Sequence, residues 1–177
     1  MQEIMLVNET EYKLLKLLGH GKGGYSYLVE KDGVQYVLKQ IHHEPCSYYT
    51  FGNKIEAERS AYQRLSLTDI RIPKMLDIDV EKERIIKEYI DGPTICQLVE
   101  TDAMEDHYYH QVREMAAMAQ AAGMNIDYVP TNFVVQEGLL YYIDYECNEY
   151  MDQWNFENWG NTYWYKSLEF LEYIANR

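Results

Sequence analysis

The sequence predicts an α+β fold in two parts: a β-rich N-terminal lobe with one helix, and a truncated, mainly helical C-terminal lobe. Three observations carry this prediction. Apolar runs typical of strands fill the first third of the chain, and helical patterns dominate the second half. Between them, Gly92-Pro93 is a strong chain break, where charge and periodicity both change. We therefore expect an N-terminal lobe over residues 1–90 and a C-terminal lobe over residues 91–177, within one domain.

Strands are expected at the start of the chain. The runs 11–18, 25–30 and 34–41 are rich in aromatic and aliphatic residues, and Asp32-Gly33 between the last two is a typical hairpin turn. The glycine-rich stretch GHGKGGYS, residues 19–26, joins the first run to the second. Glycines there let backbone N–H groups approach a phosphate. A strand follows rather than a helix, so the stretch does not fit a dinucleotide-binding fold.

The rest of the first lobe is expected to add one helix and two strands. A loop is predicted over residues 42–52, followed by a helix over 53–67 with Asn53 as its N-cap. Two further strands are predicted between residues 70 and 93, around the turn Glu81-Lys82-Glu83.

The second half opens with two predicted helices, residues 94–100 and 104–124, the latter ended by Gly123. A small hairpin is expected over residues 133–143, with its turn at Gln136-Glu137-Gly138. The aromatic tail is predicted to end in a helix. It either packs over this lobe or forms an oligomer contact.

Composition limits the class of protein. Of 177 residues, 47% are hydrophobic, which supports a packed core and excludes a disordered chain. The first residues lack the pattern of a signal peptide, and no apolar run approaches the ~20 residues that cross a bilayer. The three cysteines, Cys46, Cys96 and Cys147, are too far apart for a disulfide framework or a zinc pattern. We therefore expect a cytoplasmic protein with no membrane partner.

Charge is unevenly distributed along the chain. Residues 1–90 hold 13 Lys and Arg and 14 Asp and Glu, a net charge of −1, whereas residues 91–177 hold 3 and 15, a net charge of −12. So acidic a second half repels nucleic acid and anionic membranes. It is either a solvated acidic surface or a field that favours metal ions and a cationic substrate.

Lys39 and Glu58 are candidates for an ion pair. Lys39 alternates with two aliphatic residues of its strand, so all three point to one face. Glu58 interrupts the apolar face of the predicted helix. A lysine and a glutamate on the inward faces of their elements indicate a semi-buried pair. The alternative is two surface side chains that extend into water.

Asp127, Asn132 and Asp144 form a second candidate cluster. The first two lie in NIDYVPTNFVV, residues 125–135, and Asp144 directly follows an apolar strand. Carboxylate and amide oxygens are hard ligands that suit Mg²⁺, which also takes phosphate oxygens. Each residue alone is more typical of a turn or a helix cap.

In this order, the motifs resemble those of the protein-kinase-like superfamily, over roughly residues 12–146. GKGGYSYL, which begins at Gly21, fits its glycine-rich loop, with a register from Gly19 as the alternative. The sequence VLK ending at Lys39 resembles the third-strand lysine motif, Glu58 matches the helix partner of that lysine, and KEYIDGP is similar to the hinge. NIDYVPTN has the spacing of the catalytic loop, and IDYE stands where D-F-G would be.

The resemblance is to compact, atypical members rather than to ordinary protein kinases. Only 33 residues follow Asp144, which leaves no room for a full activation segment or a large helical lobe. The chain is more similar to RIO kinases, lipopolysaccharide-core sugar kinases and aminoglycoside phosphotransferases.

The resemblance implies ATP and Mg²⁺ as cofactors, and a role for each matched residue. Lys39, held by Glu58, would steady the α- and β-phosphates. Asp127 would accept the proton of an acceptor hydroxyl or orient that hydroxyl, and Asn132 and Asp144 would hold Mg²⁺. The other nucleotide contacts would come from the glycine-rich loop and the hinge, at Gly21, Gly23, Gly24, Ser26, Glu88, Tyr89 and Ile90.

Two positions depart from the family pattern. Asn125 replaces the catalytic-loop histidine, which is mainly a structural brace, and Val129 stands where protein Ser/Thr kinases commonly carry a lysine. Loss of a cation that meets developing charge on the γ-phosphate would cost roughly tenfold to several hundredfold in rate. The second half offers three replacements: Arg113, Lys166 and Arg177.

Two functions follow from the resemblance. The first is a small atypical ATP-dependent kinase that moves the γ-phosphate to a hydroxyl of a protein or a small molecule. The acidic second half favours a cationic acceptor and excludes nucleic acid. The second is a pseudokinase-like module that binds nucleotide, or acts only through protein contacts, without turnover. Retention of all the matched site residues favours the kinase.

Overall fold

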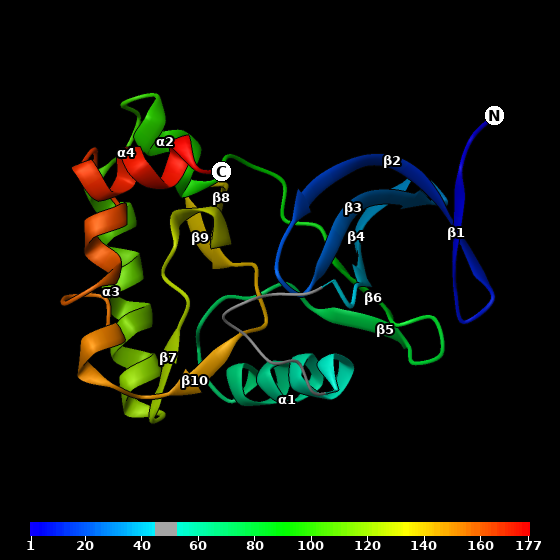
Figure 1. Ribbon diagram of the computed structural model, residues 1–177, viewed down its shortest axis with the longest axis horizontal. Helices are drawn as coiled ribbons and strands as arrows, with labels where there is room; N and C mark the ends of the chain where they lie inside the picture. Colours follow the sequence, from blue (N-terminus) through cyan, green and yellow to red (C-terminus); the bar gives the residue numbers. More distant parts are fainter. Residues whose placement is uncertain (45–52) are drawn as a thin grey trace. The chain divides into compact units, whose positions relative to one another are not determined.

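The computed structural model describes residues 1–44 and 53–177 and has an α+β fold (Figure 1). Its packing separates two compact units. The first comprises residues 1–60 and 73–89, and the second comprises residues 61–72 and 90–177. Most of the loop predicted over residues 42–52, including Cys46, lies outside the described residues.

A six-stranded antiparallel sheet makes up most of the first unit, and this sheet is curled (Figure 1). The strand order is β1-β2-β3-β4-β6-β5, so β6 lies between β4 and β5. Every neighbouring pair is antiparallel. The strands are β1 Ile4–Val7, β2 Thr10–His20, β3 Gly24–Lys31, β4 Val34–Ile41, β5 Met75–Asp79 and β6 Arg84–Glu88.

Strand β1 is an addition to the strands expected from the sequence. It joins β2 through a two-residue turn, Asn8 and Glu9, with φ values of 46° and 69°. These left-handed conformations match the mirror-image turns of tight hairpins, although the turn lacks the Asn-Gly pair that usually announces one. Asp79 stabilises the turn, because its carboxylate accepts the backbone N–H groups of Asn8 at 2.8 Å and Lys82 at 2.9 Å.

Both faces of the sheet are covered by apolar side chains. Helix α1 (Lys54–Ser66) contributes Ile55, which packs with Ile41 and Ile85 on one face. As predicted, Asn53 caps this helix, since its side chain accepts the Glu56 N–H at 3.1 Å. The opposite face is a cluster of six buried residues: Met5, Val7, Tyr12, Val29, Leu38 and Ile86.

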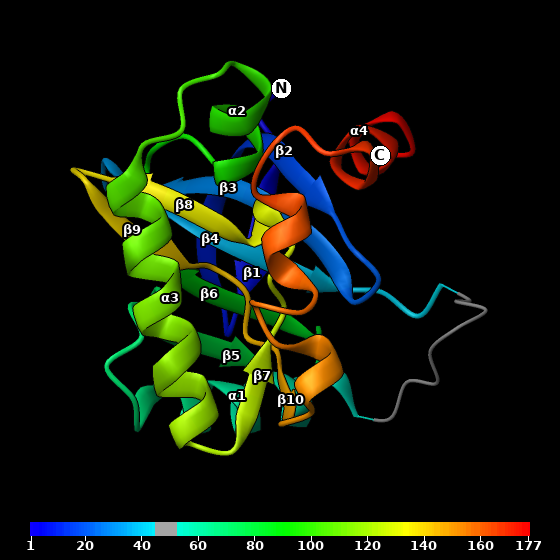
Figure 2. The ribbon, with the colours of Figure 1, turned by 90° about the vertical axis from the view of Figure 1, so that its left-hand side faces the viewer.

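The second unit holds the predicted helices and the predicted hairpin, and α3 runs alongside β7 (Figure 2). Antiparallel pairing joins β8 to β9 and β7 to β10, and the second pair was not expected from the sequence. The elements are α2 Ile95–Glu100, α3 Asp106–Ala121, β7 Met124–Ile126, β8 Phe133–Gln136, β9 Leu139–Tyr142, β10 Cys147–Glu149 and α4 Leu168–Ala175, with short 3-10 turns η1 Pro130–Asn132, η2 Asp152–Trp154 and η3 Gly160–Tyr163.

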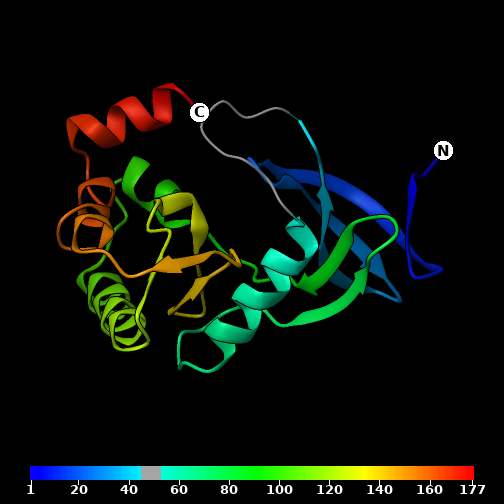
Figure 3. The same cartoon turned by 60° about the horizontal axis from the view of Figure 1, so that its bottom comes forward.

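The aromatic tail runs through η2 and η3 to the last helix, α4 (Figure 3). It packs on its own unit. The ring centroid of Phe156 lies 5.5 Å from that of Tyr128, and Trp164 lies 5.0 Å from Phe133. All four rings are buried. Gly160 permits this approach, because an added Cβ would lie 2.4 Å from the Cβ of Tyr128. The tail thus covers the segment that carries Asp127 and Asn132, which is the first of the two arrangements expected for it.

Neither membrane-spanning helices nor disulfides are found among the described residues. No helix within residues 1–44 and 53–177 is both long enough and apolar enough to cross a bilayer. The described cysteines, Cys96 and Cys147, are free thiols. Burial raises the pKa of the Cys96 thiol to about 11, so this thiol is protonated and weakly nucleophilic at neutral pH.

Asp79→Asn is expected to destabilise the protein near pH 7, and progressively less as the pH falls below about 4. The N–H groups of Lys82 and Asn8 lower the pKa of Asp79, so its charged form stabilises the fold above the unfolded pKa. This contribution is lost as the pH falls through the lower, folded pKa. Urea unfolding near pH 7 and at ~pH 3 measures the effect, with exposed Asp69→Asn as the control. Equal losses at both pH values would contradict the assignment.

Candidate functional site

Lys39 and Glu58 form an ion pair within the first unit. Nζ of Lys39, on β4, contacts Oε1 of Glu58, on α1. The two side chains are only 13% and 12% exposed. The semi-buried pair expected from the sequence is therefore present, and each charge offsets the desolvation of the other.

The glycine-rich turn is shorter than the sequence suggests. Strand β2 continues to His20, which pairs with Tyr25, so the turn is confined to residues 21–23. Gly19 lies within β2 opposite Ser26, and no atom outside its own neighbours would meet an added Cβ there. The geometry therefore favours the register that begins at Gly21.

This turn lies beside Lys39. A Cβ added to Gly24 would lie 2.5 Å from the Gln40 carbonyl oxygen, so only glycine fits that position. A Cβ added to Gly23 would lie 3.8 Å from Nζ of Lys39. Ser26 stands directly opposite Lys39 in the β3–β4 ladder. The first unit thus brings Gly23, Gly24, Ser26 and Lys39 together, with Glu58 behind the lysine.

The residues expected to form the hinge follow β6. Glu88 ends that strand, and its N–H donates to the Lys74 carbonyl at 2.9 Å. That N–H is therefore committed to the sheet. Tyr89 is the last residue of the first unit and Ile90 resumes the second. An adenine contact at this position remains a prediction for the backbone of Glu88, Tyr89 and Ile90.

Three carboxylates of the second unit converge. Asp127 follows β7, Asp144 follows β9, and Glu146 lies two residues further on. One carboxylate oxygen of each lies within 4.8 Å of the others, and all three side chains are half-buried. Glu146 was not among the expected site residues. Its spacing from Asp144 could have identified it, because residues i and i+2 of an extended segment have their side chains on the same side.

Hydrogen bonds of the Tyr142 side chain link the segment that carries Asp127 to the segment that carries Asp144 and Glu146. Its hydroxyl accepts the Asp127 N–H at 3.1 Å and donates to the Glu146 carbonyl at 2.7 Å. Burial raises the pKa of Tyr142 well above its usual range, with smaller contributions from Asp144 and Asp127. The hydroxyl therefore stays protonated and keeps its donor role.

Asn132 makes a second tie at the same place. Its side-chain Nδ2 donates to the Asp127 backbone carbonyl at 3.3 Å, and its backbone carbonyl accepts the Ile143 N–H at 2.9 Å. Because the amide donates through nitrogen, its Oδ1 is the atom that it would offer to a metal. With the three carboxylates, this is a set of hard oxygen donors, and such a set fits Mg²⁺.

Asn125 stands at the position where the resemblance would place a histidine, and it makes contacts of its own. Asn125 is buried and pairs with Asn148 between β7 and β10, and its Nδ2 donates to the Met151 carbonyl at 2.9 Å. Its Oδ1 has no hydrogen-bond partner among the described residues. A further brace comes from the tail, where the Trp164 indole N–H donates to the Tyr128 carbonyl at 2.8 Å. The loop is therefore held by the tail and by Tyr142, without a histidine.

The three candidate replacements for the absent lysine are engaged elsewhere. Arg113 pairs with Glu157 at 3.7 Å and Lys166 with Asp102 at 3.0 Å. Arg177 pairs with Glu100 at 3.3 Å. All three cations are exposed, so these pairs are weak.

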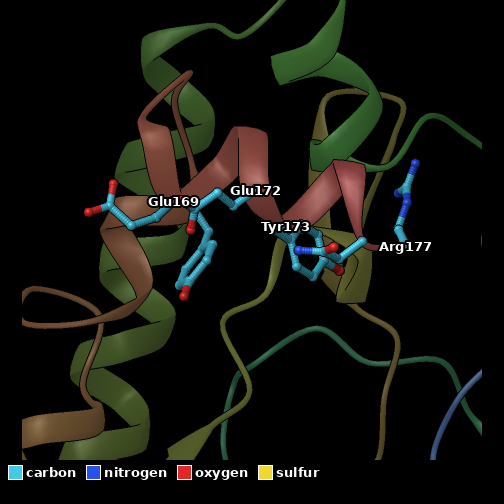
Figure 4. Close-up of a pocket in the computed structure, with 6 residues that line it drawn as sticks. Glu169, Glu172, Tyr173 and Arg177 are labelled. Carbon is cyan, nitrogen blue, oxygen red and sulfur yellow. The ribbon is translucent and has the colours of Figure 1, made fainter.

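A shallow hollow of about 450 Å³ lies along α4. In Figure 4, Glu169 and Arg177 lie on opposite sides of Tyr173, with Glu172 between Glu169 and Tyr173. The Tyr173 hydroxyl hydrogen-bonds Thr131 Oγ1 at 2.7 Å, which links the hollow to the loop that carries Asp127. Burial raises the pKa of Tyr173, and Asp127 contributes in the same direction.

Part of the chain is distantly similar to a known protein. No family model matches the chain. A segment is 27% identical over 86 residues to the KEOPS complex subunit Bud32 of Pyrococcus abyssi, which covers 47% of this chain and 39% of the relative. The chain thus matches about two-fifths of the length of that protein. The similarity supports a resemblance to the kinase-like superfamily, and it does not distinguish among the compact types.

Tyr142→Phe is expected to destabilise the protein by about 1–3 kcal/mol, since it leaves the partly buried Asp127 N–H and Glu146 carbonyl without their shared partner. Urea unfolding measures the loss. Tyr141→Phe is the matched control, because Tyr141 is only partly buried on the same strand. A loss for Tyr142→Phe no larger than that for Tyr141→Phe would show that the hydroxyl does not hold the two segments.

Proposed function

We propose that the protein is a small, atypical ATP-dependent phosphotransferase that moves the γ-phosphate of ATP to a hydroxyl group. The observation that carries the proposal is the convergence of the Asp127, Asp144 and Glu146 carboxylates in the second unit, with the Asn132 side chain hydrogen-bonded to the Asp127 carbonyl. Asp127, Asn132 and Asp144 occur in the order that the kinase-like resemblance requires. The distant similarity to Bud32 supports the same class.

Each cluster has a proposed task. The N–H groups of the turn and the Lys39 ammonium would bind the phosphates, and Glu58 would orient that ammonium. Mg²⁺, when bound by Asn132, Asp144 and Glu146, would neutralise phosphate charge. Asp127 would orient the acceptor hydroxyl and accept its proton. The proposal requires both clusters to act on one nucleotide.

The acceptor is proposed to be cationic. Residues 91–177 carry a net charge of −12, which raises the local concentration of cations. The hollow along α4 adds Glu169, Glu172 and Tyr173, and carboxylates with an aromatic ring suit an ammonium group. Arg177 also lines the hollow, but its charge is paired with Glu100. The Tyr173 hydroxyl connects this hollow to Thr131. A hydroxyl-bearing ammonium compound or a basic protein segment would therefore be preferred over an anionic acceptor.

A second candidate is a nucleotide-binding module without turnover. Val129 supplies no cation near Asp127, and Arg113, Lys166 and Arg177 pair elsewhere. This observation favours slow transfer, or none, while leaving nucleotide binding intact. Turnover distinguishes the two candidates.

Mg²⁺-ATP is expected to raise the melting temperature of the wild type, and Asp144→Ala is expected to lose the Mg²⁺-dependent part of the shift. Glu146→Gln should lose part of it, because it removes one charged ligand. Exposed Glu149→Gln is the matched control and should keep the full shift. Differential scanning fluorimetry with ATP, with and without Mg²⁺, makes the measurement. An unchanged shift in Asp144→Ala would reject the proposed metal site.

Transfer of phosphate is expected to require Asp127 and to favour cationic acceptors. Asp127→Asn should lower the rate by roughly 10²–10⁴-fold, the usual contribution of a general base. Phosphate transfer from labelled ATP to matched ammonium, neutral and carboxylate alcohols measures both effects. Glu172→Gln should raise KM for the ammonium alcohol only. Preference for the carboxylate alcohol would contradict the acceptor class, and nucleotide binding with no transfer would favour the module.

A further inference from the structure

Two histidines and a glutamate converge beside the glycine-rich turn, outside every group assigned above. One ligand atom each of His20, His42 and Glu44 lies within 4.8 Å of the others. His20 ends β2, and His42 and Glu44 follow β4, so the turn and the chain beyond β4 meet here. All three residues belong to the first unit.

The distances within this trio match a metal coordination shell. Nε2 of His20 lies 3.2 Å from Oε2 of Glu44, and Nε2 of His42 lies 3.3 Å from the same oxygen. In a tetrahedral zinc site with ligand bonds near 2.0–2.1 Å, neighbouring ligand atoms are about 3.3 Å apart. The Gly21 carbonyl oxygen, 2.7 Å from Nε2 of His42, is close enough to be a fourth ligand.

The surroundings of the trio orient it. Tyr25 stacks on the His20 ring with centroids 4.3 Å apart and planes 11° apart. The Tyr25 hydroxyl also donates to both Glu44 oxygens at 2.9 Å. Outer contacts of this kind fix ligand geometry in natural metal sites.

We propose that His20, His42 and Glu44 form a transition-metal site, with Zn²⁺ as the expected ion and the Gly21 carbonyl or a water as fourth ligand. Two imidazoles and one carboxylate are a ligand set that zinc accepts. His20 and Glu44 are each 51% exposed, so an ion can enter from solvent, while His42 is 10% exposed and anchors the site.

Metal binding would change the hydrogen bonds of His42. Its Nδ1 accepts the Glu44 N–H at 3.2 Å, so the neutral ring carries its proton on Nε2 and donates to the Gly21 carbonyl. On binding, Nε2 would give its lone pair to the ion and the ring proton would transfer to Nδ1, so the hydrogen bond from the Glu44 N–H to Nδ1 would break. The glycine-rich turn would then be fastened to the chain beyond β4. If the proposed function is correct, zinc would also restrict the turn that receives the phosphates.

Calorimetric titration of the whole chain with ZnCl₂, without ATP or Mg²⁺, tests the site independently of the proposed function. The wild type should bind one Zn²⁺. His20→Ala and Glu44→Gln should each weaken affinity by more than about 100-fold, and Tyr25→Phe by about tenfold, the range for outer contacts. His43→Ala is the matched control, because His43 pairs with Glu83 at 2.7 Å instead. It should stay within about twofold of the wild type.

Three results would overturn the site. The first is that the wild type does not bind zinc. The second is that His43→Ala and His20→Ala lose zinc affinity equally. The third is that Asp144→Ala loses zinc affinity while His20→Ala retains it. The last would place the ion on the carboxylate cluster. Melting temperatures measured without zinc show that the variants are folded, and the exposed His20 and Glu44 can be replaced without opening the core.

Discussion

The second unit depends on a single buried hydroxyl. Tyr142 lies on β9, yet its oxygen contacts both the N–H of Asp127 and the carbonyl of Glu146. Those backbone groups belong to the two segments whose carboxylates converge. Buried polar groups need partners, so this hydroxyl stabilises the two segments where they lie side by side, together with the hydrogen bonds of Asn132 and Trp164. The backbone at Asp127 and Glu146 is held directly by that hydroxyl.

The aromatic tail supports the same constraint from the other side. Phe156 and Trp164 pack against Tyr128 and Phe133, and the Trp164 indole holds the Tyr128 carbonyl next to Asp127. A loop that lacks a bracing histidine is thus held by rings from the chain end. In the first unit, the ion pair of Lys39 and Glu58 has the corresponding role, since it fixes the ammonium beside the glycine-rich turn.

Much of this architecture could be predicted from local sequence patterns. Helical spacing placed Glu58 on the inward face of α1, and strand alternation placed Lys39 opposite it. The turn at Glu137 and Gly138, both with positive φ, was predicted because Gly138 favours that conformation. Such features depend on residues close in the sequence, so local sequence patterns are enough to predict them.

The features that were missed depend on contacts between distant segments. Strand β1 needs the Asp79 carboxylate to hold its turn, about 70 residues away along the chain. The β7–β10 pair is three residues long on each side, too short for periodicity to show. The roles of Tyr142 and Glu146 follow from a hydrogen bond that only the fold creates. His20, His42 and Glu44 are likewise brought together by the β2–β3–β4 meander rather than by sequence spacing.

The proposed function requires one Mg²⁺-ATP to contact both the glycine-rich turn and the carboxylate cluster. Paramagnetic NMR with Mn²⁺ in place of Mg²⁺ tests this claim most directly, because Mn²⁺ broadens the signals of nearby amides. With ATP and Mn²⁺, we predict loss of the amide signals of Asp127, Asn132 and Asp144 together with those of Gly23 and Gly24, and retention of both sets in Asp144→Ala. Broadening restricted to exposed acidic residues, or equal broadening in the variant, would contradict the account.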